Sequence, residues 1–221
     1  MKKTYSDRLS LIASLIENAV VLHVGCCDSP YTSQRYQDGS LLHLALEKLS
    51  PLVYGVDIDI TSLEYLRSRG HNVGDRTQVF QLLYDYYDIA SNRHHPLVII
   101  MGETIEHVSN VRDLLDSLKP YLSLPSIKTS IVITTPNLLS LQSIIQHLLN
   151  RTKIHPDHHI GFTMTLLRQC LISNGFSVSN CHYTSLERLN APRTFRDRVY
   201  RLIGTFMPRL SDTLFIECEL A

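Results

Sequence analysis

Short runs of apolar residues recur along the chain, and segments of helical periodicity separate them. The runs are rich in β-branched residues and apolar on both faces, which is typical of strands that helices cover on each side. Turn-forming residues bound them. The pattern predicts strands over residues 20–24, 52–56, 97–101 and 131–134, followed by strands over 176–183 and 213–219.

Amphipathic segments fill the intervals and predict helices over 41–49, 62–69, 111–118, 163–174 and 194–206. Ser40 is a candidate N-cap of the first of these helices, Gly70 closes the second, and the third is expected to end before Pro120. A further short strand is expected just before Asp75. Strand and helix in alternation require right-handed crossovers. We therefore predict one α/β domain over 1–221, a doubly wound, seven-stranded, mostly parallel sheet with helices on both faces.

Composition and charge describe an ordinary globular protein. Of 221 residues, 44% are apolar and 19% charged, and 21 basic residues balance 21 acidic ones, so no net charge would attract nucleic acid. Five cysteines without CxxC spacing indicate reduced thiols. Glu17 and Asn18 interrupt the N-terminal apolar stretch, and no run approaches the roughly 18 apolar residues of a membrane span. We expect a cytoplasmic protein.

Parallel α/β sheets bind ligands at the carboxyl ends of their strands. Gly25 follows the first predicted strand and lets a ligand approach the backbone, while Asp57 follows the second and is placed to accept hydrogen bonds from a ribose diol. Either residue alone is equally consistent with a tight turn or a solvated acid. Together they favour a nucleoside-containing cofactor, bordered by Cys26 and Ile58, with Asp75 near the adenine amino group.

The loop after the first strand distinguishes between cofactors. A dinucleotide site needs further glycines so that a pyrophosphate can sit on the helix N-terminus. This loop instead has Cys27 and Ser29 at the later positions. NAD and FAD are therefore disfavoured, and a cofactor without phosphate, such as S-adenosylmethionine (SAM), is favoured.

Two clusters of titratable residues follow the later strands. If a helical turn begins at Glu103, then Glu106 and His107 share its face and suit a divalent cation or a general acid/base site. The alternative is a helix N-terminus with favourable acids and a surface histidine. A second cluster, His-Pro-Asp-His-His, occupies 155–159. The alternative interpretation of this cluster is an ordinary polar loop. Asn137, after the fifth strand, is a candidate for hydrogen bonding to a substrate.

These motifs, in order, resemble the class I SAM-dependent methyltransferases, which have a Rossmann-like fold. The resemblance rests on VLHVGCC, GVDID, GETIEHVSN, LKP, ITTPN, DHHIGFT and LISNGF, and extends from about Val20 to the last strand. It is strongest to small bacterial methyltransferases associated with surface-polysaccharide biosynthesis. Quinone-biosynthesis O-methyltransferases share the E-x-x-E-H arrangement. Hen1-type enzymes, which methylate the terminal ribose of RNA, share it together with the T-P-N and D-H motifs.

The resemblance implies roles for individual residues. Gly25 would line the methionine part of SAM, Asp57 would hold its ribose, and Glu103 would border the cofactor. His107 or His158 would act as a metal ligand or as the general base, and a metal-free site with histidine alone as base stays open. The ligands implied for Mg²⁺ or Mn²⁺ are Glu103, Glu106, His107 and His158.

The resemblance alone suggests which molecule accepts the methyl group, because no single residue or motif of the chain identifies it. A hydroxyl of a sugar or glycan is the first expectation. The alternatives are an RNA 3′-terminal ribose, a phenolic quinone precursor, and a non-catalytic scaffold of the same fold. RNA lacks support from charge, since the one basic stretch comprises Arg193, Arg196, Arg198 and Arg201. That stretch is expected to form an amphipathic helix on the sheet, or else to contact a membrane or a lipid-linked acceptor.

Overall fold

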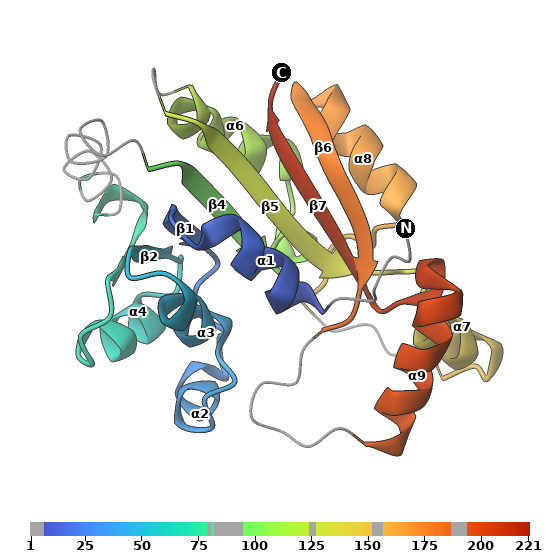
Figure 1. Cartoon of the computed structure of the whole chain (residues 1–221). Coiled ribbons are helices and arrows are strands. Elements are labelled where there is room, and N and C mark those ends of the chain that lie inside the picture. Colours follow the sequence, from blue (N-terminus) through green and yellow to red (C-terminus); the bar gives the residue numbers. More distant parts are fainter. Residues whose placement is uncertain (1–6, 79–80, 82–94, 124–126, 152–156, 187–193) are drawn as a thin grey trace.

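A computed structural model of the chain contains one mixed sheet of seven strands (Figure 1). It describes residues 7–78, 81, 95–123, 127–151, 157–186 and 194–221, without the side chains at 196, 197 and 201. His155 and Arg193, named above, lie outside these residues. The elements in chain order are α1 (Arg8–Ile16), β1 (Val20–Val24), α2 (Thr32–Gln37), α3 (Leu42–Leu49), β2 (Val53–Val56), α4 (Ile60–Arg67), β3 (Val73–Gly74), β4 (Leu97–Gly102), the 3₁₀ turn η1 (Ile105–His107), α6 (Val111–Leu122), β5 (Thr129–Pro136), α7 (Leu141–Leu148), α8 (Met164–Ser173), β6 (Phe176–Thr184), α9 (Phe195–Phe206), η2 (Pro208–Leu210) and β7 (Thr213–Leu220).

The strand order is β3-β2-β1-β4-β5-β7-β6, and β7 alone runs antiparallel to both of its neighbours. The prediction of a doubly wound, mostly parallel seven-stranded sheet is confirmed. Because β1 pairs with both β2 and β4, the chain winds outward in opposite directions from this strand. The crevice for a ligand in such a sheet lies at the carboxyl ends of the strands flanking this switch point.

Alternate residues of the central strands pack on opposite faces. Val20 and Leu22 join the larger core cluster, which α6 and α8 cover, whereas Val21 joins the cluster beneath α1 and α3. Figure 1 shows α1 crossing in front of the sheet. Burial on both faces explains the continuous apolar runs of the sequence. Among the described helices, none is long and apolar enough to cross a bilayer.

Two predicted helix ends are wrong, for reasons outside local sequence. Ser40 does not cap α3: the N-cap is Leu41, which makes no side-chain capping bond. Helix α6 does not stop before Pro120 but continues through Tyr121 and Leu122, both packed in the core. An interior proline costs about 3 kcal/mol, and burial of two large apolar side chains offsets that cost. The other predicted boundaries lie within two residues of those observed.

Candidate active site

A cavity of about 1250 Å³ opens at the carboxyl ends of β1, β2 and β4. Its lining includes Gly25, Asp57, Glu106 and His158, which come from four separate segments of the chain. Ligand pockets in proteins usually measure roughly 300–1000 Å³. This cavity therefore has room for a nucleoside cofactor and a second molecule beside it.

Position 25 requires glycine for two reasons, its backbone conformation and the close approach of a neighbouring side chain. Its φ is +75°, and a Cβ there would lie 2.5 Å from Thr104 Oγ1. Its N–H donates to the Val56 carbonyl over 2.8 Å, which joins the ends of β1 and β2. By contrast, the described non-glycine residues with positive φ are Glu103 and Asn150, so Cys27 has an ordinary backbone conformation that does not require glycine.

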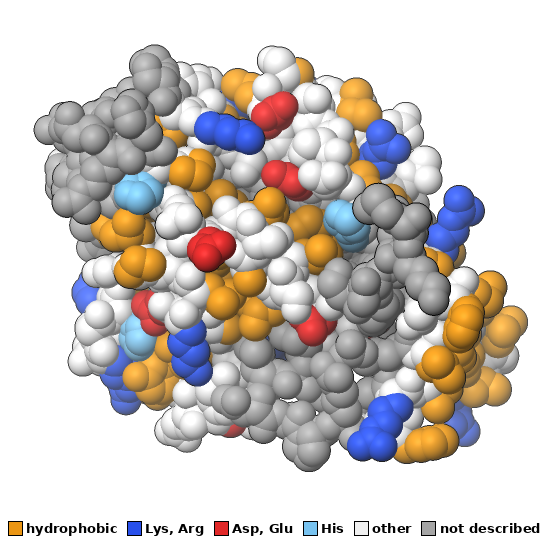
Figure 2. Space-filling view, in the orientation of Figure 1, with side chains coloured by type: hydrophobic (Ala, Val, Ile, Leu, Met, Phe, Trp, Pro, Cys, Tyr) orange, Lys and Arg blue, Asp and Glu red, His pale blue; other side chains and the backbone are white. Residues whose placement is uncertain are grey.

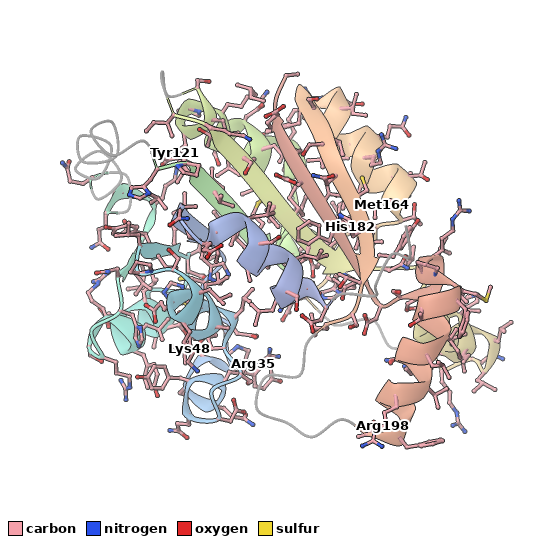
Figure 3. All side chains as sticks on the ribbon, viewed as in Figure 1. Arg35, Lys48, Tyr121, Met164, His182 and Arg198 are labelled. Carbon is pink, nitrogen blue, oxygen red and sulfur yellow. The ribbon has the colours of Figure 1, made fainter. Side chains whose placement is uncertain are left out.

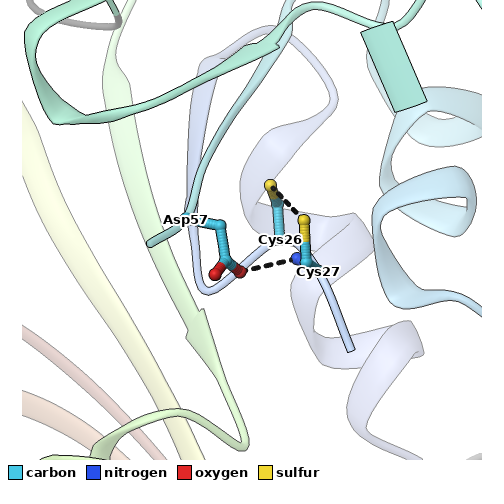
Figure 4. Close-up of side chains that lie close together, drawn as sticks. All are labelled: Cys26, Cys27 and Asp57. Atoms are coloured by element: carbon cyan, nitrogen blue, oxygen red, sulfur yellow. Dashed lines mark hydrogen bonds between the residues drawn. The ribbon is translucent and has the colours of Figure 1, made fainter. Parts of the chain in front are cut away.

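Three backbone N–H groups donate to the Asp57 carboxylate and form a cradle around it; Figure 4 shows the bond from Cys27. Cys27 N donates to Oδ2 over 2.8 Å, while Ile58 N and Asp59 N donate to Oδ1 over 2.7 and 3.1 Å. A carboxylate offers about four acceptor sites, so capacity remains on Oδ2. The cradle fixes the carboxylate between the two loops, where it fits the predicted contact with a ribose diol.

Three other residues were expected to border the cofactor, and their surroundings differ. Cys26 borders the cavity, but its side chain is buried beside Leu63, with Sγ 3.9 Å from Cys27 Sγ. Ile58 is 96% exposed. Asp75 lines the cavity, and its Oδ1 accepts from the backbone N–H and hydroxyl of Thr77, which lowers the pKa of Asp75. The contact of Asp75 with adenine stays a prediction.

Glu106 is a buried carboxylate with one unused oxygen. Only 1% of the residue is exposed, and its Oε2 accepts from the Thr135 hydroxyl over 2.9 Å. Oε1 is equally buried and has no hydrogen-bond donor among the described residues. Burial, reinforced by the nearby Glu103 charge, raises the pKa of Glu106 to about 8. Without a cation beside it, Glu106 is therefore mostly protonated at neutral pH.

Two histidines face this carboxyl group. The His107 and His158 rings are 4.6 Å apart, and one ligand atom from each, together with one from Glu106, lie within 4.8 Å of one another. Backbone bonds hold the segments together, since His159 N donates to the Glu106 carbonyl over 2.8 Å. His107 Nδ1 lies 3.1 Å from the carbonyl oxygen of Asp157. Because a carbonyl only accepts, Nδ1 carries the proton and Nε2 of the neutral ring carries the lone pair.

This cluster fits a divalent cation. Two imidazoles and a carboxylate form a donor set that suits Mn²⁺ and softer ions better than Mg²⁺, which prefers oxygen. The unpartnered Glu106 Oε1 is the kind of buried polar atom that a cation would satisfy. The carbonyl bond at Nδ1 of His107 is the outer-shell contact that orients a ligating histidine.

Glu103 does not join that cluster. The helical turn predicted to begin at Glu103 begins instead at Ile105, so the expected shared face does not form. Glu103 has a φ of 55°, and its N–H donates to the Thr134 carbonyl. Its carboxylate lies 3.5 Å from Arg8 Nη1. The negative charge of Glu103 contributes to the raised pKa of Glu106.

Arg8 is a site residue that sequence reasoning missed. It is 5% exposed, lines the cavity, and contacts Thr134 Oγ1 at 3.4 Å as well as Glu103. A signal exists in the sequence: Arg8 precedes Ile12 and Ile16 by four and eight residues, on the apolar stripe of α1. A cation at such a position points inward and needs a buried partner.

A buried histidine pair was also missed. His23 and His43 are 1% and 0% exposed, and their Nδ1 atoms lie 3.2 Å apart. Burial lowers the pKa of both, that of His43 to about 3, so both rings are neutral. One Nδ1 must donate and the other accept, so the rings are opposite tautomers. His23 lines the cavity and gives its wall a neutral polar group.

The side chain of Asn137 makes hydrogen bonds within the fold. Its side-chain amide donates to the carbonyls of Arg209 and Ser211 over 2.9 and 2.8 Å, and its oxygen accepts from Leu139 N. The residue is 2% exposed. The suggestion that it binds a substrate is therefore not supported.

The fold and site together define an α/β protein with a cavity at the switch point of its sheet and an adjoining Glu–His–His cluster. No family model and no curated protein matches the chain. Solved structures do. It is similar to a SAM-dependent methyltransferase from Archaeoglobus fulgidus, at 20% identity over 96% of this chain and 94% of that one, with a TM-score of 0.51.

Two further solved structures cover most of the chain. Magnesium protoporphyrin IX methyltransferase from Synechocystis, with bound S-adenosylhomocysteine (SAH), matches at 13% identity over 96% of this chain and 82% of that one, with a TM-score of 0.53. The methyltransferase domain of bacterial CtHen1 matches at 16% identity over 97% and 98%, with a TM-score of 0.52. The chain thus has the fold of the SAM-dependent methyltransferases.

Proposed function

We propose that the chain is a SAM-dependent O-methyltransferase that acts on a hydroxyl of a sugar or glycan, with a divalent cation at Glu106, His107 and His158. One observation carries this proposal: a single cavity contains both the Asp57 cradle and the Glu–His–His cluster. A cofactor held at the first would have an acceptor at the second as its neighbour, and methyl transfer needs that proximity.

The charge of the cavity lining supports SAM as the cofactor. Eight acidic residues and three arginines line it. SAM carries a sulfonium cation that its product lacks, so an acidic cavity favours the reactant over the product. The acidic residues are Asp28, Asp57, Asp59, Asp75, Glu103, Glu106, Asp113 and Asp157.

The same lining supports a neutral acceptor. Binding of an RNA 3′ end depends on basic residues that neutralise phosphates, and an acidic cavity opposes it. A sugar with neighbouring hydroxyls offers two oxygens to a cation without adding negative charge. We therefore favour a glycan over RNA, although both present a vicinal diol.

The protein's residues would position the acceptor and accept its proton. Asp57 would hold the cofactor ribose, and the backbone at Gly25 would pass close to the methionine part. His107 has its single lone pair at Nε2, because Nδ1 bonds the Asp157 carbonyl. That lone pair would ligate the cation when one is bound, and in a metal-free site it would instead accept the hydroxyl proton. When bound, a divalent cation lowers the pKa of a coordinated hydroxyl and fixes its position.

Calorimetric titration with SAH tests the cofactor site. We expect binding to the wild type and at least about tenfold weaker binding to Asp57→Ala, corresponding to about 1.4 kcal/mol. Asp116→Ala is the matched control, because Asp116 is an acid on α6 outside the cavity, paired with Lys119. Absence of SAH binding to the wild type, with or without Mn²⁺, would favour the non-catalytic scaffold.

Methyl transfer from radiolabelled SAM tests the acceptor. We expect Mn²⁺-dependent labelling of neutral glycans and little labelling of RNA oligonucleotides with a free terminal diol. Glu106→Gln and His158→Ala should lose transfer while still binding SAH. Labelling of RNA alone would replace the glycan with a ribose acceptor, and transfer unaffected by either substitution would remove the cation from the proposal.

A further inference from the structure

Helix α9 presents its apolar side to solvent. Phe195, Leu202 and Phe206 are spaced by seven and four residues, so they share one helix face, and they are 81%, 61% and 79% exposed. Gly204 lies on the opposite face and is buried. A helix that packs on a globular core shows the reverse arrangement. Three large apolar side chains on one side of α9 are therefore left mostly exposed, while Val199 and Ile203 on the same side are half-buried.

Helix α7 and the loop before it continue this exposure. Helix α7 buries none of its residues, and Ile145 and Leu148 are 38% and 75% exposed. The loop is joined to the end of α9 through η2, because Asn137 donates to the carbonyl of Arg209. In the view of Figure 1, α7 lies behind α9, and Figure 2 shows apolar side chains gathered at this part of the surface.

Exposed apolar side chains are concentrated in this region. Nine of the fifteen large ones in the described part of the chain belong to residues 138–149 and 195–207. An exposed apolar area of this kind marks an interaction site rather than ordinary surface. We name it the α7–α9 apolar surface; its members are Leu138, Leu139, Ile145, Leu148, Leu149, Phe195, Leu202, Phe206 and Met207.

Cations accompany the apolar surface. The sequence of α9 holds three arginines and one aspartate, and Arg209 follows in η2. Arg198 and Arg209 are exposed, and Figure 3 shows Arg198 at one end of α9. Phenylalanine and leucine on one helix side with arginines beside them are typical of helices that lie in the plane of a membrane interface. Each basic residue near an anionic leaflet adds about 1 kcal/mol of attraction.

We infer that the α7–α9 apolar surface docks the protein on bilayers that contain anionic lipids. The arginines select the headgroups, and the apolar side chains enter the acyl boundary. Docking itself is independent of methyl transfer. One consequence rests on the proposed function: Pro136 and Leu186 line the cavity and flank this surface in sequence, so an acceptor on a lipid carrier would approach from this side.

Vesicle flotation with the full chain tests the inference. We expect the protein to float with vesicles of equimolar phosphatidylcholine and phosphatidylglycerol, less with phosphatidylcholine alone, and less at high salt. Leu202→Ser combined with Phe206→Ser should reduce binding by about tenfold or more, because two large apolar side chains no longer enter the bilayer. Arg198→Glu should reduce binding to the anionic vesicles specifically.

Matched substitutions elsewhere control for general loss of hydrophobicity. Leu166 and Ile172 are 53% and 56% exposed on α8, so Leu166→Ser combined with Ile172→Ser should bind vesicles as the wild type does. Thermal melts and SAH titration of each variant show whether it is folded. Equal binding by both double variants, or no binding by the wild type, would overturn the inference. So would light scattering that shows the α9 substitutions dissociating a dimer that does not bind vesicles.

Discussion

Replacement of Glu106 by glutamine should stabilise the protein in a strongly pH-dependent way. The fold raises the pKa of this carboxyl from 4.5 to about 8, mainly by burial. An acid with a raised pKa contributes stability that is fully present below its unfolded pKa and is lost as the pH rises through its folded pKa. Glutamine has no charge to bury, and its side-chain oxygen can still accept from Thr135. The two proteins should therefore differ little at pH 4.5 and increasingly above it.

The magnitude follows from linkage. Each pH unit between the two pKa values costs the wild type about 1.4 kcal/mol, so the advantage of Glu106→Gln should reach roughly 4 kcal/mol near pH 8. In a domain of this size, 1 kcal/mol corresponds to about 2–4 °C in Tm, which predicts a gap of roughly 10 °C. Thermal melts between pH 5 and 8 in the presence of a chelator measure this gap. Glu64→Gln, at an exposed position on α4, is the matched control and should show no such trend.

Addition of Mn²⁺ should close most of the gap between the two proteins at pH 8. A cation at a concentration a hundredfold above its Kd stabilises the protein that binds it by about 2.7 kcal/mol, and Glu106→Gln lacks the anionic ligand. A Tm difference that does not change with pH would show that Glu106 is ionised in the fold without a cation, which would refute the reasoning. An equal response of both proteins to Mn²⁺ would place the cation elsewhere.

Three other substitutions test neighbouring parts of the site. Gly25→Ala should lose SAH binding and about 1–2 kcal/mol of stability in urea unfolding, because φ is positive and the new Cβ meets Thr104; an unchanged protein would contradict the required close approach. Cys27→Gly should keep SAH affinity within about threefold in calorimetry, since the wild-type residue already has unstrained backbone; a large change would show that the thiol contacts the cofactor. In an Arg8→Met background, the Tm difference between Glu106 and Glu106→Gln proteins should keep growing to higher pH, because the Arg8 charge lowers the pKa of Glu106. An unchanged pH dependence would show that other groups screen the Arg8 charge from Glu106.

The fold was predictable because its physics is local and repetitive. Strands buried on both faces produce unbroken apolar runs, and the run at Val20–Val24 matches its strand residue for residue. Features that depend on tertiary packing were not predictable in the same way. Pro120 ends a helix by local rules, yet α6 continues because Tyr121 and Leu122 reach the core.

The site, like the fold, combines features that the sequence indicates with features that depend on tertiary packing. His107 and His158 were paired through resemblance to a family, since spacing alone does not bring residues about fifty positions apart together, and the structure places their rings 4.6 Å apart. Glu103 was misplaced because its positive φ begins the loop differently from a helix. Arg8 was overlooked because an arginine in a surface helix is ordinarily solvated. Only its position on the apolar stripe, together with the partners it meets across the sheet, explains its burial.

The first loop has Cys27 and Ser29 where a dinucleotide site has further glycines, and this does not weaken the case for a cofactor without phosphate. A glycine there matters where the backbone needs positive φ or where a ligand needs the space of a Cβ, and only Gly25 in this loop has positive φ. Cys27 contributes to the Asp57 cradle through its backbone N–H, which a residue of any type other than proline provides. A cofactor without phosphate also does not require the array of N–H groups that a pyrophosphate does. Cys27 and Ser29 at these positions are therefore compatible with a SAM site, and they do not favour the non-catalytic scaffold over the enzyme.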